Sequence, residues 1–402
     1  MTLSTLSKIE DSTSLSSRSS VQGCLIPAAA RLSFLVPLLI MSTVILGCSV
    51  KAPSLDTPCQ KLPYYTKLVS AELNQTIREL PACMTYKRAQ YEKRLLDILK
   101  NEASSEELLH ERLMLEHLAL IPKTYDYENC ISSAFLRLAS AVYSPSERAV
   151  ILPGWVSISS PILLHEVVHH VQHEQVHINS MAPIRGFFHD SALAIGALLE
   201  GDAEFITQKL IRYHPQQLLP DATRETLFAN SVEESEKCHT LSTLKELFAA
   251  QYGYGVAFWK HLETYAPQIQ RDVVLKEPPL QTRFILHPDK YLHSNLTAKV
   301  DEQNDNRCSR SVGELMLRTS LSQFFDEAYV RRVAEGLKHD CFQVNTVEAS
   351  QVQVQWTTQW EREEDAENFL RILNTIRQLS ADAFPGKAIQ ETTTVLYTFV
   401  DE

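Results

Sequence analysis

One stretch near the middle of the chain, residues 162–171, reads Ile-Leu-Leu-His-Glu-Val-Val-His-His-Val. On an α-helix, residues four apart share a face and lie about 6 Å apart along the axis, so the imidazoles of His165 and His169 can bind one tetrahedral ion. Glu166 can then reach a water molecule beside that ion. A purely structural helix rarely buries two histidines and a glutamate among so many apolar residues. The pattern predicts a zinc site on a helix that spans residues 162–177.

A third zinc ligand is expected further along the chain. In the arrangement HExxHxxGxxH a glycine and a third histidine follow, but this chain has Gln172 and Gln175 at those positions. Glu200, 31 positions after His169, lies in an otherwise apolar part of a helix expected over residues 192–213. Because an uncompensated carboxylate would be costly there, we predict that Glu200 is the third ligand. The fourth position of the ion then stays open to water.

Two more carboxylates lie close to Glu200 in the sequence. Glu204 follows one helical turn later on the same face, so we expect it to hydrogen-bond a ligating histidine from outside the metal shell. Asp202 is expected to face elsewhere and to serve helix packing or a loop contact. Only one of the three carboxylates can therefore point straight at the metal.

Three further histidines follow the motif at positions 170, 173 and 177. His173 and His177 continue the face of His169, but each further turn moves a side chain about 5.4 Å away from the metal. They cannot join the same ion. We interpret these histidines as a solvated helix face, with a weak accessory metal site as the alternative.

The composition limits the class of protein. The chain has 402 residues, of which 44% are hydrophobic and 22% are charged, so it contains ample apolar material for a large core. The net charge is −11, and no run of lysines and arginines is present that could follow a phosphate backbone. We therefore expect no nucleic-acid partner.

The N-terminal residues 1–48 have the layout of a signal peptide. An apolar run follows Arg31 and ends in Leu46-Gly47-Cys48, which resembles a bacterial lipobox. In such a leader the cysteine is lipidated and becomes the mature N-terminus, so Cys48 would attach the protein to a membrane. Ser49 is typical of outer-membrane sorting, which predicts an outer-membrane lipoprotein of the cell envelope. An uncleaved anchor and a plain signal peptide are the alternatives, although Pro37 interrupts the run.

Six cysteines follow Cys48. An even number in an oxidising compartment permits disulfides, and buried free thiols are the alternative. Six cysteines allow 15 pairings, so the sequence assigns none of them. The wide spacing of the six, without a C-x-x-C pair, argues against a thiolate zinc site.

The pattern along the chain predicts an α+β fold that is predominantly helical. We expect a tether over 49–84, a main domain over 85–340 and a small C-terminal β-α-β unit over 341–402. Within the main domain we expect two helices in 85–119 with a cap at Ser105, a β-hairpin in 139–157 before the metal helix, helices at 222–236 and 241–264, and a loop at 295–310. An extended peptide could pair with an edge strand of that hairpin, which indicates a protein or peptide substrate.

These residues resemble a group of bacterial HExxH zinc metallopeptidases of the gluzincin type. The family pattern is HExxHxxQ, then D…A…EGDA, YxxG, HPxKY and GE. The matching residues are His165, Glu166, His169, Gln172, Asp190, Glu200-Gly201-Asp202-Ala203, Tyr252, Gly255, His287-Pro288, Lys290-Tyr291 and Gly313-Glu314. Three positions depart from the pattern, namely His170, His173 and Arg283. None of the three removes an expected ligand.

The resemblance implies a gluzincin-like core over residues 85–340 and a zinc-dependent peptidase activity. Zn²⁺ would be held by His165, His169 and Glu200, with Glu166 as the general base. A tyrosine or histidine usually stabilises the oxyanion in that family. The candidates here are His287, Tyr291 and Tyr254, in that order, although the segment His287-Pro288-Asp289-Lys290-Tyr291 could simply cap and turn the chain.

Two other functions remain open at this point. The chain could be a non-catalytic, zinc-stabilised envelope lipoprotein that acts as a binding scaffold, which would tolerate loss of Glu166. It could also be a zinc amidase acting on a cell-wall or lipid-linked amide. The presence of Glu166 beside intact ligands disfavours the scaffold, whereas only a substrate screen separates the amidase from a peptidase.

Overall fold

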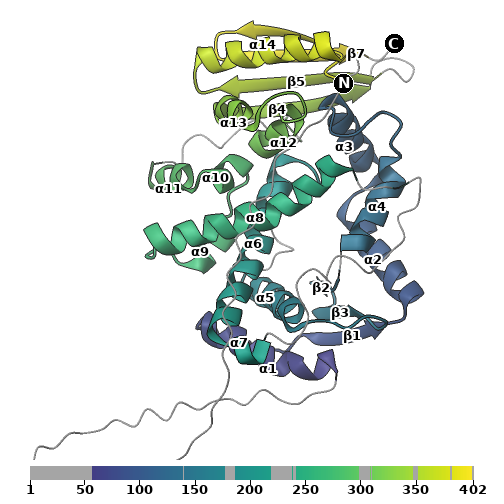
Figure 1. The fold of residues 1–402 in the computed structure, drawn as a ribbon, viewed down its shortest axis with the longest axis vertical. Coiled ribbons are helices and arrows are strands. Elements are labelled where there is room, and N and C mark those ends of the chain that lie inside the picture. The colour runs from purple at the N-terminus through teal and green to yellow at the C-terminus, as the bar shows by residue number, and fades with distance from the viewer. Residues whose placement is uncertain are drawn as a thin grey trace, which may run out of the picture. The chain divides into compact units, whose positions relative to one another are not determined.

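The computed structural model describes residues 57–138, 140–176, 186–218, 238, 241–297, 308, 310–346, 352–380 and 383–400. They form an α+β fold in which helices predominate, as expected (Figure 1). The helix expected at 222–236 and the leader with Cys48 lie outside the described residues, as does most of the loop expected at 295–310. None of the described helices is long and apolar enough to cross a membrane.

The helices of the described residues have the following bounds: α1 Pro58–Glu72, α2 Arg88–Glu102, α3 Ser105–His117, α4 Tyr127–Leu138, α5 Ser160–Val176, α6 Asp190–Tyr213, α7 Pro215–Leu218, α8 Ser242–Tyr265, α9 Arg271–Lys276, α10 Thr282–Leu286, α11 Pro288–Thr297, α12 Gly313–Leu321, α13 Glu327–Ala334 and α14 Glu363–Leu379. The strands are β1 Ala82–Tyr86, β2 Val142–Ser144, β3 Ala149–Pro153, β4 Leu337–Thr346, β5 Val352–Trp360, β6 Lys387–Glu391 and β7 Thr394–Val400.

A small sheet precedes α5, the helix that carries His165 and His169. Strands β2 and β3 form the expected antiparallel hairpin, with Val142 opposite Ile151. Strand β1 adds to the other side of β3 in parallel, so the strand order is β1-β3-β2 and β2 is an edge strand. The hairpin prediction is confirmed, and the third strand was not anticipated.

The interpretation of residues 49–84 as a tether is wrong for residues 58–84. Helix α1 contacts α5 and α6, and its Tyr65 and Val69 are buried. Tyr65 donates a hydrogen bond of 2.7 Å to Ser160, the first residue of α5. Burial of aromatic and aliphatic side chains against α5 and α6 outweighs the weak helical pattern of this proline-containing segment.

The two helices expected in residues 85–119 are present as α2 and α3. The N-cap of α3 is Ser104 rather than Ser105. The Ser104 side chain accepts a hydrogen bond from the Glu107 backbone, and the Glu107 side chain accepts one from the Ser104 backbone. This reciprocal pair satisfies two donors that the start of a helix leaves unpaired.

The longest helices, α6 and α8, pack closely against each other. Gly201 on α6 faces Gly255 on α8, and a Cβ atom added to Gly201 would lie 2.3 Å from the Gly255 Cα atom. Any larger residue at either position would force the two backbones apart. The glycines of the EGDA and YxxG patterns therefore allow α8 to lie directly over the part of α6 that carries Glu200.

The C-terminal unit is larger than the expected β-α-β outline. Its four strands form an antiparallel sheet in the order β4-β5-β7-β6, and α14 covers one face of that sheet (Figure 1). Phe369, Ile372, Leu373 and Ile376 of α14 are buried at helical spacing. The expected boundary near residue 340 falls inside strand β4, because the hairpin partner of β5 starts at Leu337.

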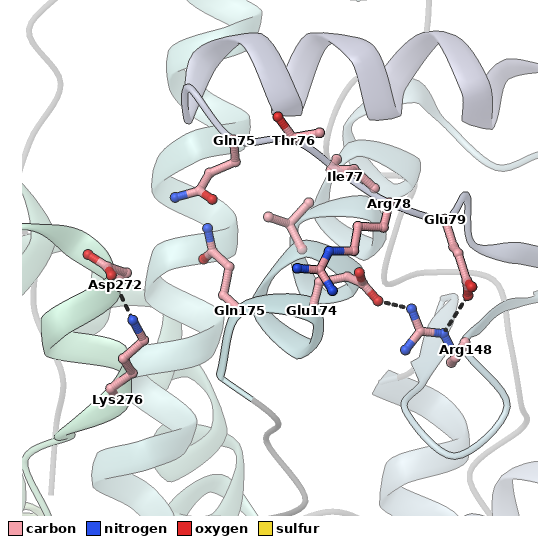
Figure 2. A pocket seen from close by; sticks show the side chains of 11 residues that line it. Gln75, Thr76, Ile77, Arg78, Glu79, Arg148, Glu174, Gln175, Asp272 and Lys276 are labelled. Carbon is pink, nitrogen blue, oxygen red and sulfur yellow. Dashed lines mark hydrogen bonds and ion pairs between the residues drawn. The ribbon is translucent and has the colours of Figure 1, made fainter.

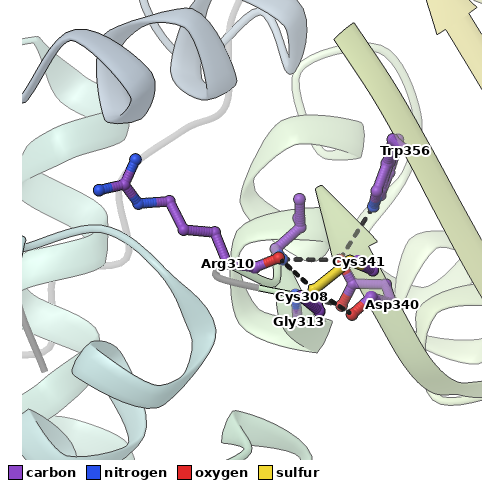
Figure 3. The surroundings of a disulfide bond; sticks show 7 residues. Cys308, Arg310, Gly313, Asp340, Cys341 and Trp356 are labelled. Carbon is purple, nitrogen blue, oxygen red and sulfur yellow. Dashed lines mark hydrogen bonds between the residues drawn. A yellow bond between two sulfur atoms is a disulfide. The ribbon is translucent and has the colours of Figure 1, made fainter. Parts of the chain in front are cut away.

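Asp340 and a disulfide attach β4 to the start of α12 (Figure 3). The buried Asp340 carboxylate accepts hydrogen bonds from the backbone N–H groups of Val312 and Gly313 and from the indole of Trp356. Cys308 and Cys341 form the disulfide next to it. The other two disulfides join Cys59 to Cys83 and Cys130 to Cys238, so all six cysteines after Cys48 are paired.

Candidate metal centre

Three side chains from two helices converge on one point. The Nε2 atom of His165 lies 3.0 Å from the Nε2 atom of His169 and 3.0 Å from the Oε2 atom of Glu200. The distance from His169 Nε2 to Glu200 Oε2 is 3.5 Å. Helix α5 supplies both histidines and α6 supplies the carboxylate. The structure thus brings together the three residues that the sequence predicts as ligands.

These distances match the size of a zinc shell. Ligand atoms bound to zinc at 2.0–2.2 Å in tetrahedral directions lie about 3.3–3.6 Å from one another. The three observed separations, 3.0, 3.0 and 3.5 Å, agree with this value to within a few tenths of an ångström. Two imidazoles and one carboxylate are also a donor set that zinc commonly takes in sites that keep a fourth position open. The residues therefore fit the metal that the sequence implies.

The triad is reachable from solvent, and among the described residues no lysine or arginine forms an ion pair with it. The side chains of His165, His169 and Glu200 are 11%, 16% and 27% exposed. Burial alone would lower the pKa of His169, but the Glu200 carboxylate raises it to about 9. Burial alone would raise the pKa of Glu200, but His169 and His165 hold it well below its usual range. In the absence of a metal, a protonated His169 provides the positive charge that this carboxylate requires.

Glu166 lies beside the triad and is held by the edge strand. Its side chain is buried, and this burial raises the pKa of its carboxyl group. The backbone N–H of Tyr143 on β2 donates a hydrogen bond to it. A carboxyl group whose pKa lies above its usual value is better suited to taking up and returning a proton.

Tyr252 is a member of the site that the sequence indicates only through the YxxG pattern. Its ring stacks on His165 with 6.0 Å between ring centroids, and 43% of the residue is exposed. Burial of its hydroxyl end and the nearby Glu200 carboxylate raise the pKa of Tyr252 well above its ordinary value. The hydroxyl group therefore stays protonated and can donate a hydrogen bond. Its position depends on the close approach of Gly255 to Gly201, which no local pattern reveals.

The oxyanion donors expected from the sequence have other contacts. His287 Nε2 lies 2.9 Å from the buried Glu314 Oε1, and Arg318 contacts both of these side chains. Tyr291 is buried in the hydrophobic core, with its ring against Phe258. None of the contacts described for His287 involves the triad, so the catalytic prediction for His287 and Tyr291 gains no support from the structure.

Tyr254 is also poorly placed to act with the triad. It is two residues after Tyr252 on α8, which turns it about 200° around the helix. Because Tyr252 faces His165, Tyr254 points to the opposite side. Of the tyrosines on α8 in the described part of the chain, Tyr252 is therefore the one beside the metal centre.

The expected solvated face of α5 is instead buried. His170 and His173 are 0% and 8% exposed, and their Nδ1 atoms lie 3.1 Å and 2.8 Å from the hydroxyl of Tyr143. The Nε2 atom of His170 donates to the backbone oxygen of Glu79 at 2.8 Å. These histidines attach α5 to β2 and to the loop after α1, because packing of α1 and the sheet covers this side of the helix. His177 lies outside the described residues.

The two carboxylates near Glu200 lie on the sides of α6 that the sequence predicts. Glu204 Oε2 lies 3.9 Å from His165 Nδ1, so it faces a ligating histidine as expected, at ion-pair rather than hydrogen-bond distance. Asp202 faces away from the triad, is fully buried and contacts Gln172 and Arg271. It thus connects α6 to α5 and α9 behind the metal centre.

A separate cavity of about 580 Å³ lies behind α5 (Figure 2). Glu174, which lines it, is nine residues after His165 and so lies about 180° around the helix from that ligand. Most charged side chains that line the cavity pair with one another. Arg148 pairs with Glu79 and Glu174, and Lys276 pairs with Asp272. The triad does not line this cavity.

Comparisons with models of protein families, with curated proteins and with solved structures find no match for this chain. The functional interpretation therefore depends on the chemistry of the site itself. The group of side chains of a type and spacing that could hold a metal, among the described residues, is His165, His169 and Glu200.

Proposed function

We propose that the chain is a zinc-dependent hydrolase, and that its substrates are peptides or proteins. The observation that carries this proposal is the convergence of His165 Nε2, His169 Nε2 and Glu200 Oε2 at 3.0–3.5 Å beside a buried Glu166. Zinc bound by these three groups would polarise a scissile carbonyl and lower the pKa of a water molecule. The triad would keep one side of the ion free for both.

The side chains of the site have complementary roles in this proposal. Glu166 takes the proton of the attacking water and passes it to the leaving amine, which its raised pKa favours. The backbone N–H of Tyr143 keeps the Glu166 carboxylate in place. Tyr252 remains protonated and donates a hydrogen bond to the oxyanion as the carbonyl carbon becomes tetrahedral.

A peptide substrate is supported by the edge strand β2 beside Glu166. Among the described residues, strand β2 pairs on one side only, with β3, so its other side can accept an extended chain. The zinc amidase remains an alternative, because the same machinery would cleave other amides. A non-catalytic scaffold is less well supported, because it gives no reason for a buried carboxyl group at position 166 beside the triad.

The cell envelope is the location that fits this proposal. Three disulfides between the described cysteines favour an oxidising compartment. A lipidated Cys48 would attach the chain to the membrane. Fatty-acid labelling that is equal in the parent chain and in a Cys48→Ala variant would contradict this attachment.

Digestion of a broad peptide library by the purified protein tests the activity. We expect cleavage that stops when a chelator is added and returns with zinc. Cell-wall and lipid-linked amides should be tested in parallel, since cleavage of these alone would favour the amidase. Absence of cleavage in every pool, by a protein that holds one zinc ion per chain, would favour the scaffold.

A further inference from the structure

We propose that Gln172, Asp202 and Arg271 form a positioning network that determines which nitrogen of His169 faces the metal centre. This inference rests on the proposed zinc site and adds residues that act through His169. It starts from an unusual contact of a ligating histidine. The other ring nitrogen of such a histidine commonly donates to a carboxylate or to a backbone carbonyl, and here it meets a glutamine.

Which side chain donates in the hydrogen bond between His169 and Gln172 depends on the orientation of the Gln172 amide. His169 Nδ1 lies 2.7 Å from Gln172 Oε1, and an amide oxygen can only accept a hydrogen bond. In this orientation Nδ1 must carry the proton. A flipped amide would present an N–H group instead, and Nδ1 would have to accept.

The far end of the Gln172 side chain prevents that flip. Its Nε2 atom donates to the backbone oxygen of Leu199 at 2.9 Å and to Asp202 Oδ2 at 2.8 Å. Both partners are acceptors only, so a flipped Gln172 would direct its oxygen at two other oxygens in a fully buried position. The amide is thus held in the one orientation that keeps the proton of His169 on Nδ1.

Arg271 is the ion-pair partner of Asp202 in the interior. Its Nε atom donates to Asp202 Oδ1 at 2.7 Å, and one of its terminal nitrogens contacts Oδ2. Asp202 is 0% exposed, so its charge needs this partner. Arg271 also donates to Gln175 Oε1 at 2.5 Å, which ties the start of α9 to the metal helix.

The consequence reaches the metal centre through His169. With the proton held on Nδ1, the lone pair that remains in the neutral ring is on Nε2, the atom that faces His165 Nε2 and Glu200 Oε2. A ring with its proton on Nε2 would direct an N–H group at the ion. The network therefore selects the form of His169 that can bind a metal, although Asp202 and Arg271 do not touch the centre themselves.

Exchange of the two polar partners tests this network. Asp202→Asn and Gln172→Glu should each weaken zinc affinity by about 10–100-fold. Asp202→Asn can place an amide N–H opposite the Gln172 N–H, and Gln172→Glu places a carboxylate opposite the Asp202 carboxylate. In the double variant, the new carboxylate at position 172 can accept from His169 and from the new amide at position 202, whose oxygen accepts from Arg271 Nε. The hydrogen bond to Leu199 and the second contact with Arg271 are lost. We therefore expect zinc affinity within about tenfold of the parent protein in the double variant, a non-additivity that general damage to the fold would not produce.

Asp365→Asn is the matched control. It alters another buried aspartate paired with an arginine, since Arg362 lies 2.7 Å from Asp365 on α14, and it should leave zinc affinity unchanged. Gln172→Leu removes the acceptor while Arg271 still neutralises Asp202, so it covers the case in which Asp202→Asn does not fold. Zinc binding at parental affinity in the single variants, or a double variant as weak as the two changes combined, would overturn the network.

A measurement on the metal-free protein separates this inference from the proposed function. In ¹⁵N-histidine-labelled protein at pH 10, where the imidazole is neutral, long-range ¹H–¹⁵N spectra should place the proton of His169 on Nδ1. In Gln172→Leu the proton should be distributed over both nitrogens. A proton on Nε2 in the parent protein would refute the network whether or not zinc binds. A protein that fails to bind zinc but keeps the proton on Nδ1 would refute only the zinc site.

Discussion

Two histidine–glutamate pairs in this molecule have almost the same spacing and different surroundings. His165 Nε2 lies 3.0 Å from Glu200, and His287 Nε2 lies 2.9 Å from Glu314. At the second pair, Arg318 contacts both partners and supplies a cation. At the first pair, a second imidazole takes the third position, and no lysine or arginine among the described residues forms an ion pair with Glu200.

The difference shows what distinguishes a candidate metal centre from a structural ion pair. A buried carboxylate needs a positive partner, and a guanidinium already provides it at Glu314. Around Glu200 the protein presents three lone-pair donors that face one another, an arrangement that only a cation or a shared proton can stabilise. The proximity of histidine to glutamate therefore does not by itself indicate a metal site, whereas convergence without a lysine or arginine makes His165, His169 and Glu200 the candidate.

The largest expected effect is on turnover and concerns the carboxylate beside the first pair. Glu166→Gln should keep about one zinc ion per chain and lose activity by several orders of magnitude, because it removes the base and leaves the ligands. Metal content and initial rates on the best library peptide measure the two effects separately. The exposed Glu246→Gln is the control, and near-parental turnover in Glu166→Gln would show that the mechanism is wrong.

The two glutamates should respond in opposite ways when each becomes a glutamine. Glu200→Gln should weaken zinc binding by more than the roughly 100-fold of an outer contact, because it removes a ligand. Glu314→Gln should keep zinc but destabilise the fold by about 3 kcal/mol, since Arg318 would lose its partner in a buried position. Zinc titration and urea unfolding of both variants make the comparison. Full zinc occupancy in Glu200→Gln would show that another carboxylate is the third ligand.

A smaller effect is expected at Tyr252. Tyr252→Phe keeps the ring stacked on His165 and removes the hydroxyl, so kcat should fall about 100-fold while zinc affinity changes little. Tyr254→Phe on the other side of α8 is the matched control. Equal rates in the two variants would argue against Tyr252 as the oxyanion donor.

The smallest effect concerns a third buried carboxylate, Asp190, which forms no ion pair with a lysine or arginine among the described residues. Burial, with Asp340 and Glu314 nearby, raises the pKa of Asp190 to about 7, and the hydrogen bonds from Thr282 offset only part of that rise. Because the folded pKa is raised, the contribution of Asp190 to stability is present at low pH and is lost as the pH rises through about 7. Between pH 5 and 8 this loss should be on the order of 2 kcal/mol.

Urea unfolding of the metal-free protein at pH 5 and pH 8 checks this sign. Asp190→Asn should remove most of the decrease, because an amide does not titrate. A parent protein that becomes more stable with rising pH, to the same extent as the variant, would contradict the assignment. The result would place Asp190 with the structural carboxylates rather than with Glu200.

The candidate ligands could be predicted from the sequence because their signals are local. Two histidines four apart need only helical geometry, and Glu200 is conspicuous as a carboxylate in an apolar helix. The hairpin before α5 and most helix positions follow from periodicity for the same reason. The four-stranded C-terminal sheet was only partly anticipated, because β4 and β6 have no clear pattern without their neighbours.

The remaining features depend on contacts between segments far apart in the chain. Strand β1 is defined by its pairing with β3, where Ala82 lies opposite Ala149. Tyr252 reaches His165 only because Gly201 and Gly255 let two backbones touch. His170 looks solvated in the sequence and is buried by the loop that carries Glu79. Such features require the crossing of helices and sheets to be known, which one-dimensional periodicity does not contain.

Zinc titration of the metal-free protein tests the central claim most directly. The account predicts one tightly bound zinc ion per chain, lost in His165→Ala and retained in His293→Ala, whose histidine is exposed on α11. It also predicts that affinity falls about tenfold for each pH unit below 9, since a metal must displace the proton of His169, whose pKa is about 9. A chain that binds no zinc, or that binds it equally well after His165→Ala, would contradict the account.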